Sequence, residues 1–269
     1  TMHTKLYAYQ TYAIAATVRA GDAPQALLWD DLDPYHYVRL TDATPGFAEL
    51  IVGGEDHKTG QQPHPNLAFE NLERWARERF PSMGVVTHQW SGEVMETLDG
   101  LGYYGRNPGS GENVYIMTGD SGMGMTHGTL GALLITDLVQ QRENPWTELY
   151  DPARKPAASL GEFARENINV AGQYFDWAKG APSADRDEIA LNPGEGRVFQ
   201  RGTQKIAAHC DENGTIHECS AVCPHLGCIV DWNETEHTWD CPCHGSRFNP
   251  RGEVIHGPSP TNLAPVPPA

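Results

Sequence analysis

The sequence lacks early cysteines, long apolar runs and an excess of basic residues. All six cysteines lie after residue 209, so the disulfide scaffold of a small secreted protein is not indicated. The longest apolar candidate, residues 130–139, contains Asp137 and is far shorter than the roughly 20 residues of a membrane span. A formal net charge of -16 disfavours nucleic acid and anionic membranes. We therefore expect a soluble, cytoplasmic protein with no membrane span and no nucleic-acid partner.

Two short boxes combine cysteine with histidine. The first reads Cys223-Pro224-His225-Leu226-Gly227-Cys228 and the second reads Cys241-Pro242-Cys243-His244-Gly245-Ser246. Two Cys/His pairs on facing loops can hold two irons, with the thiolates of Cys223 and Cys241 on one iron and the imidazoles of His225 and His244 on the other. This interpretation predicts electron transfer. A zinc knuckle uses the same donor types, although six donors crowd the boxes and zinc needs four.

The spacing of the boxes, CxH followed by CxxH, resembles the Rieske 2Fe-2S domain. The resemblance implies a disulfide between Cys228 and Cys243, as in the subclass whose two cluster loops are tied together. It also implies that Ser246 donates a hydroxyl hydrogen bond to a cluster sulfur, and that Pro258 lies in a loop that shields the cluster. Phe248 stands where high-potential members carry Tyr, so we expect one hydrogen bond to be missing.

Three regions follow one another along the chain, and together they predict an α+β fold. Residues 1–158 mix strand-like stretches with helical patterns, residues 159–187 form a helical bridge and linker, and residues 188–269 form an all-β module. Strands are expected at Leu6–Val18, Tyr35–Leu40, Glu49–Val52, Met83–Trp90 and Val114–Thr118, with a helix near Leu67–Phe80. Ser159 and Glu162 fit a capping box. Cys210 and Cys219 lie outside the two boxes, and they either form a disulfide or remain free thiols.

A glycine-rich turn runs from the strand at 114–118 into a helix expected to reach about Gln141. The backbone N–H groups and the positive end of such a helix can face an anion, although glycine turns also occur for packing reasons. Trp90-Ser91-Gly92, Asp99-Gly100-Leu101 and Gly105-Arg106-Asn107-Pro108 precede this turn. With them, the segment resembles the C-terminal flavin-contacting part of the D-amino acid oxidase-like FAD-dependent oxidoreductases. The flavin neighbours that this resemblance implies are Gly119, Asp120, Gly122, Gly124, Met125 and Thr126, with Asp120 reaching the ribityl chain.

Two departures from that family stand out. The GxGxxG loop that binds the ADP half of FAD is absent, so we expect this chain to be the C-terminal portion of a longer protein, missing the N-terminal FAD-binding half and inactive by itself. Where amino-acid oxidising members often carry Arg-Pro, this chain has Val94-Met95. Arg106 is either a substitute for that substrate anchor or a surface arginine. The catalytic residues stay unassigned.

The leading hypothesis is an oxidoreductase. In it, a flavin oxidises a small organic substrate and the Rieske cluster relays single electrons to a protein or quinone acceptor. The alternative is an electron carrier or redox-sensing module with a non-catalytic N-terminal region. A Rieske oxygenase component would add a mononuclear iron held by two histidines and a carboxylate, and His57, His64 and His88 show no such pattern. A metal site at residues 53–58 is also disfavoured, because a strand ending in a glycine turn explains that segment.

Overall fold

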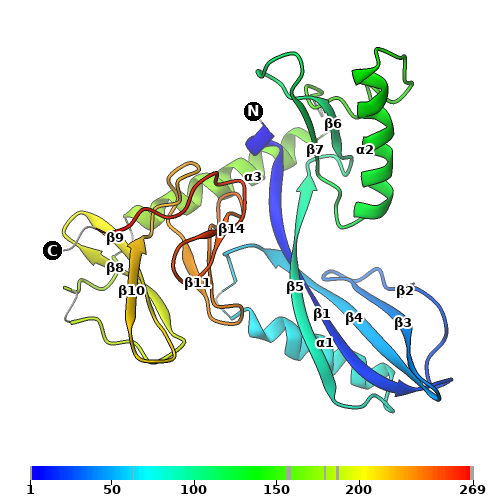
Figure 1. The fold of residues 1–269 in the computed structure, drawn as a ribbon, viewed down its shortest axis with the longest axis horizontal. Coiled ribbons are helices and arrows are strands. Elements are labelled where there is room, and N and C mark those ends of the chain that lie inside the picture. The colour runs from blue at the N-terminus through cyan, green and yellow to red at the C-terminus, as the bar shows by residue number, and fades with distance from the viewer. Residues whose placement is uncertain (1, 63, 156–158, 179, 186–187, 267–269) are drawn as a thin grey trace.

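The computed structural model describes residues 2–62, 64–155, 159–178, 180–185 and 188–266. It combines helices with four antiparallel β-sheets, which confirms the expected α+β class. Figure 1 shows a long twisted sheet with α1 against it, a hairpin with α2 beside that sheet, and a separate group of short strands reached through α3. No helix among these described residues is long and apolar enough to cross a membrane.

The largest sheet has five strands in the order β2-β3-β4-β1-β5. Its members are β1 (Leu6–Arg19), β2 (Leu28–Trp29), β3 (His36–Thr44), β4 (Phe47–Lys58) and β5 (Val86–Thr97), with the 3-10 turn η1 (Met2–Thr4) before β1. Helix α1 (Asn66–Arg79) covers one face and buries Leu72 against Tyr12 and Ile14 of β1. Alternate residues of a strand point to one face, so the even-numbered residues of β1 build this core.

The expected strands of this region are all present, and β5 differs most from the expectation. It begins at Val86 instead of Met83 and continues to Thr97. Met83 is buried and its N–H bonds the carbonyl of Phe80, so it belongs to the turn that follows α1. The strand extends beyond Trp90 because it pairs with β1 along its length, from Leu6 opposite Thr97 to Ala16 opposite Val86.

A two-stranded hairpin and α2 form the next unit. The hairpin contains β6 (Tyr103–Arg106) and β7 (Tyr115–Thr118), and α2 spans Gly124–Val139. A Cβ on Gly131 would overlap the Met117 side chain and lie 3.2 Å from Tyr104, so the glycine helps the helix to approach the hairpin closely. The helix ends two residues before Gln141, which has a positive φ of 57°.

Helix α3 (Leu160–Gln173) and the 3-10 turn η3 (Tyr174–Trp177) occupy the segment expected as a bridge. The capping-box interpretation is wrong, because Ser159 precedes the helix with φ -107° and ψ 25° and makes no capping side-chain bond. Glu162 instead accepts a bond from Arg165 one turn later.

The remaining strands form two small sheets. One contains β8 (Gly196–Arg201), β9 (Gln204–Cys210) and β10 (Ile216–Ser220), and the other contains β11 (Asp231–Asn233), β12 (Thr238–Asp240), β13 (Arg247–Phe248) and β14 (Val254–His256). Trp239 and Phe248, both fully buried, face each other across β12 and β13. They pack with the cysteines of the two boxes in one core.

Candidate metal centre and cofactor cradle

The two Cys/His boxes fold into loops with matching backbone hydrogen bonds. In the first loop, Cys223 N–H bonds the carbonyl of Cys228 at 2.8 Å, and Gly227 N–H bonds the carbonyl of Cys223 at 2.9 Å. In the second loop, Cys241 bonds Ser246 at 2.8 Å and Gly245 bonds Cys241 at 3.0 Å. Gly227 and Gly245 have φ values of 83° and 80°. Glycine adopts this left-handed conformation without strain, which explains its place in both boxes.

A disulfide between Cys228 and Cys243 joins the loops, with the Cα atoms 6.4 Å apart. The sulfurs of Cys228, Cys241 and Cys243 lie within 4.8 Å of one another, but the disulfide removes two of these three as thiolate donors. Two thiols and two imidazoles therefore remain in the loops. That donor set suits a Rieske cluster, and its residue types also suit zinc.

The structure brings all four sequence-predicted ligands together. Cys223 and Cys241 are 1 % exposed, His244 is 8 % exposed and His225 is half-buried. The two imidazole rings lie 4.9 Å apart between centroids. The Nδ1 atom of each ring is buried and has no hydrogen-bond partner among the described residues. An unpaired buried polar atom costs about 1–3 kcal/mol, so this arrangement fits a bound group that both nitrogens contact.

Hydrogen bonds and burial set the charge of these donors. The pKa of Cys223 is lowered to about 6, first by its hydrogen bond with Cys241 and further by the backbone N–H groups of His225 and Leu226. Burial and then the neighbouring His225 lower the pKa of His244 to about 4. A thiolate and a neutral imidazole are the forms that bind metal. Cys223 and His244 are thus in binding-competent forms near neutral pH. The hydrogen bond with Cys223 and then burial raise the pKa of Cys241 well above its usual value, so a metal must displace the proton of this thiol.

The residues expected around the cluster lie against these loops. Ser246 is fully buried, hydrogen-bonds Cys223, and accepts a 2.9 Å bond from the N–H of Ser259. This bond ties the segment that contains Pro258 to the second loop. Phe248 is fully buried beside the cluster loops.

Cys210 and Cys219 form no disulfide and are buried in β9 and β10. Burial raises the pKa of the Cys219 thiol to about 12, so this thiol is unreactive near neutral pH. The two cysteines are core residues of the β-module, outside the cluster loops.

The rest of the chain encloses the two loops. Tyr174 donates to the carbonyl of Leu226 at 2.8 Å, and Trp177 of the same turn, η3, donates to the carbonyl of Gly227 at 2.9 Å. A Cβ on Gly245 would overlap the Glu93 carboxylate and Ala8, so β1 and β5 approach the second loop closely. Sequence reasoning missed these contacts because no local pattern encodes them.

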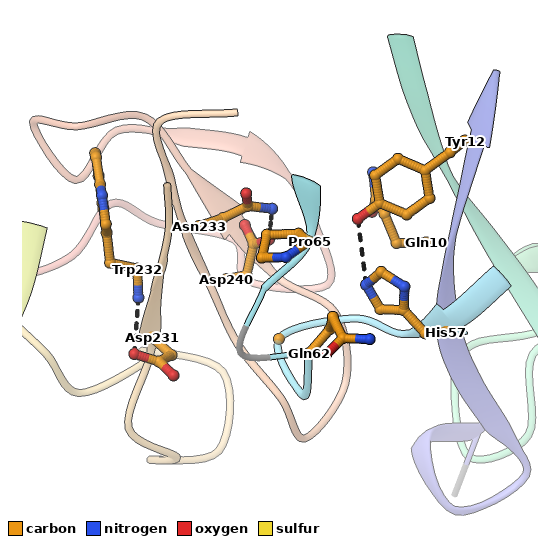
Figure 2. A pocket seen from close by; sticks show the side chains of 10 residues that line it. Gln10, Tyr12, His57, Gln62, Pro65, Asp231, Trp232, Asn233 and Asp240 are labelled. Atoms are coloured by element: carbon orange, nitrogen blue, oxygen red, sulfur yellow. Dashed lines mark hydrogen bonds between the residues drawn. The ribbon is translucent and has the colours of Figure 1, made fainter. Parts of the chain in front are cut away.

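A polar pocket lies where the large sheet meets the β-module. Figure 2 shows Tyr12 and His57 on the sheet side, with the Tyr12 hydroxyl 3.2 Å from Nε2 of His57, and Asn233 and Asp240 on the module side. Beside it, Glu236 of the module bonds Gln10 and Ser91 of the sheet. His57, which lies in the segment considered for a metal site, is therefore hydrogen-bonded to Tyr12 at this interface.

The predicted flavin neighbours lie together in the loop that enters α2. Gly119, Ser121 and Gly122 have positive φ values of 77°, 48° and 76°, and a Cβ on Gly119 would overlap the Thr97 side chain. A Cβ on Gly124, the first residue of α2, would lie 2.9 Å from a carboxylate oxygen of Asp120. The loop is therefore packed against β5 at its start, and Asp120 lies over the helix N-terminus.

Apart from Asp120, the first turn of α2 is exposed. Met125 is 90 % exposed, Thr126 is exposed, and the residue before the helix makes no capping side-chain bond. The first N–H groups of a helix need partners from outside it and favour anions. Arg106, the possible substrate anchor, donates to the carbonyl of Glu112 and lies 5.7 Å from the Tyr115 ring. It is thus engaged within its own hairpin.

Two family models match this chain, one over each of the two regions. The model of the family "FAD dependent oxidoreductase" matches residues 2–138, and that of the "Rieske [2Fe-2S] domain" matches residues 182–267. A Bacillus subtilis (strain 168) protein named as a Rieske 2Fe-2S iron-sulfur protein, YhfW, is 31 % identical over 95 % of this chain and 49 % of its own length. The chloroplastic cytochrome b6-f complex iron-sulfur subunit of Oryza sativa subsp. japonica is 32 % identical over 45 % of this chain and 50 % of its own length.

The chain spans about half the length of these two curated relatives. Among solved structures, glycine oxidase from Geobacillus kaustophilus is similar, with 18 % identity over 56 % of this chain and 40 % of that chain, at a TM-score of 0.47. FAD and a Rieske 2Fe-2S cluster are the cofactors of the two matched families. The chain therefore belongs to the FAD-dependent oxidoreductases of the D-amino acid oxidase-like family and carries a Rieske 2Fe-2S domain.

Proposed function

We propose that the protein couples flavin-linked oxidation of a small organic substrate to single-electron transfer through its Rieske cluster to an outside acceptor. In this proposal, Cys223 and Cys241 bind one iron and His225 and His244 bind the other. The observation that carries it is the convergence of these four donors, three of them buried and His225 half-buried, with both Nδ1 atoms left unpaired among the described residues. When bound, a reduced flavin supplies two electrons and the cluster accepts one.

The residues of the chain have separate tasks in this proposal. The N–H groups of His225 and Leu226, with the Ser246 hydroxyl, bond the Cys223 sulfur and stabilise its charge. The Cys228–Cys243 disulfide keeps the two loops facing each other. At the other region, the open first turn of α2 would present N–H groups to the flavin, and Asp120 would reach the ribityl chain.

The position of the β-module favours coupling over two independent functions. Bonds from Tyr174 and Trp177 hold the first cluster loop, and β5 approaches the second loop at Gly245. Because the turn from Gly119 also packs against β5, through Thr97, one strand contacts both the expected flavin loop and a cluster loop.

The test uses the purified full protein under anaerobic conditions. Irradiation with EDTA as the electron donor reduces bound flavin, which is followed by its absorbance, while EPR follows the reduced cluster. We expect the cluster signal to rise as the flavin is reduced, and the cluster-free His244→Ala variant to show flavin reduction without that signal. A wild-type cluster that stays oxidised beside fully reduced flavin would contradict the proposal. Protein that purifies with a cluster and no flavin would favour the electron-carrier alternative.

A further inference from the structure

His3 lies against the two histidines of the cluster loops. It belongs to η1, in the FAD-oxidoreductase region and 222 residues from His225 in sequence. Its Nε2 atom lies 3.3 Å from Nε2 of His225. Its ring centroid lies 4.3 Å from that of His225 and 5.8 Å from that of His244. One imidazole therefore lies across both histidines of the cluster loops.

The two nitrogens that meet have complementary roles. An imidazole that binds iron through Nδ1 carries its proton on Nε2 and can donate it. The buried, unpaired Nδ1 of His225 leaves Nε2 as the atom that meets His3. A neutral His3 has one acceptor nitrogen, so it can accept this N–H. Metal-bound histidines almost always give their second N–H to such a partner, which orients the ring and raises its basicity.

Neighbouring contacts hold His3 in place. The Lys5 N–H bonds the carbonyl of Met2 at 2.9 Å, and the Lys5 ammonium bonds the carbonyls of Pro152 and Arg154 at 2.9 and 2.7 Å. Asn167 of α3 donates to the carbonyl of Thr4 at 3.1 Å. The short turn that carries His3 is thus fixed from two sides.

We propose that His3 completes the iron-sulfur site by accepting the Nε2–H of His225 and fixing the orientation of that imidazole. His3 is a positioning residue, because it acts on the cluster through His225. The inference rests on the proposed ligand set and adds a member from the FAD-oxidoreductase region. A partner that accepts a hydrogen bond from a ligand makes the ligand more electron-donating, which favours the oxidised iron and lowers the reduction potential.

The experiment compares three variants in the full protein loaded with its cluster. His3→Ala removes the acceptor, His3→Gln keeps an oxygen that can accept the same N–H, and His88→Ala removes an exposed histidine that lies on β5 and pairs with Glu49. Protein-film voltammetry and EPR are recorded for each. At a fixed applied potential, we expect the reduced-to-oxidised ratio to rise about fivefold in His3→Ala, the equivalent of one ordinary hydrogen bond. His3→Gln should recover much of the shift, and His88→Ala should match the wild type.

An unchanged potential and EPR spectrum in His3→Ala would overturn the inference, as would an equal shift in His88→Ala. Loss of the cluster from His3→Ala with retention in His3→Gln would support it, because only the acceptor differs. Failure of this inference can be distinguished from failure of the proposed function. If flavin reduces the cluster and His3→Ala changes nothing, only the role of His3 fails. If His3→Ala shifts the potential but flavin never reduces the cluster, only the coupling fails.

Discussion

The cluster loops and the loop before α2 are the two proposed cofactor sites of this chain, and they differ in how far they are buried. The cysteines of both cluster loops are buried, the loops share a disulfide, and η3 bonds the first loop. The first turn of α2 is open, and Met125 is 90 % exposed. The proposed cluster ligands come from two adjacent loops that face each other, whereas the proposed flavin neighbours come from a single loop.

The largest expected effect is at the cluster. His244→Ala removes one of four proposed ligands and leaves the thiolates without the second iron, so we expect the Rieske EPR signal to be lost. His217→Ala, in the same module but bonded to Asp211, is the matched control and should keep it. Flavin absorbance in the full protein should be unaffected by either change. A normal Rieske signal in His244→Ala would refute the ligand assignment.

The next largest effect is expected at the loop that enters α2. Gly119→Ala places a methyl group against Thr97 at a positive φ of 77°. Such strain costs about 1–3 kcal/mol, so FAD affinity of the full protein should fall about tenfold. Gly109→Ala is the control, because Gly109 has a similar φ of 80° and open space around it. This variant measures the effect of backbone strain outside the expected flavin loop. Fluorescence titration of released FAD measures the FAD affinity of both variants. Equal losses of affinity would mean that the loop containing Gly119 does not contact the flavin.

The disulfide is expected to stabilise the cluster without holding iron. Cys228→Ser opens a link between residues 15 apart in sequence, which the loop-entropy model values at about 3 kcal/mol. We expect a Rieske signal that survives at low temperature but is lost at a lower guanidinium concentration. Cys210→Ser, at a free buried thiol, controls for the loss of a buried sulfur. If the two variants lose their clusters at the same denaturant concentration, the disulfide has no such role.

A pH effect tests the interface between the two regions. Burial raises the pKa of Glu93 from 4.5 to about 9, and both its carboxylate oxygens are unpaired among the described residues. Folded protein therefore keeps a proton that unfolded protein releases, so the stability from this group falls as pH rises from 4.5 to about 9. Glu93→Gln should be more stable than the wild type by a margin that grows by about 1 kcal/mol per pH unit. Urea unfolding at several pH values measures the margin, and a constant margin would contradict the shifted pKa.

The smallest effect concerns tuning of the cluster. Phe248→Tyr adds a hydroxyl at a fully buried ring that packs with the cluster cysteines. A hydrogen bond from that hydroxyl to a cysteine sulfur, worth about 1 kcal/mol, should raise the potential by some tens of millivolts. Protein-film voltammetry measures the change. An unchanged or lower potential would show that position 248 does not face a sulfur.

Much of the candidate site could be predicted from the sequence because its determinants are local. The boxes from Cys223 to Cys228 and from Cys241 to Ser246 each contain their donors, their turn glycine and their disulfide cysteine within six residues. The strand-to-helix turn before α2 could be predicted for the same reason. The capping box at Ser159 failed because the pattern is only a preference, and Arg165 competes for Glu162.

The sequence by itself determined the two cofactor-binding regions, the four donors and the glycines that let the loops turn, because each depends on neighbours along the chain. Only the tertiary structure decided what surrounds them. It placed His3 against His225, Glu93 against Gly245, and η3 against the first loop, and it left Cys210 and Cys219 unpaired. These contacts join residues as many as 222 positions apart. The contacts form because the β-module packs on β1, β5 and α3, and no local sequence pattern encodes that packing.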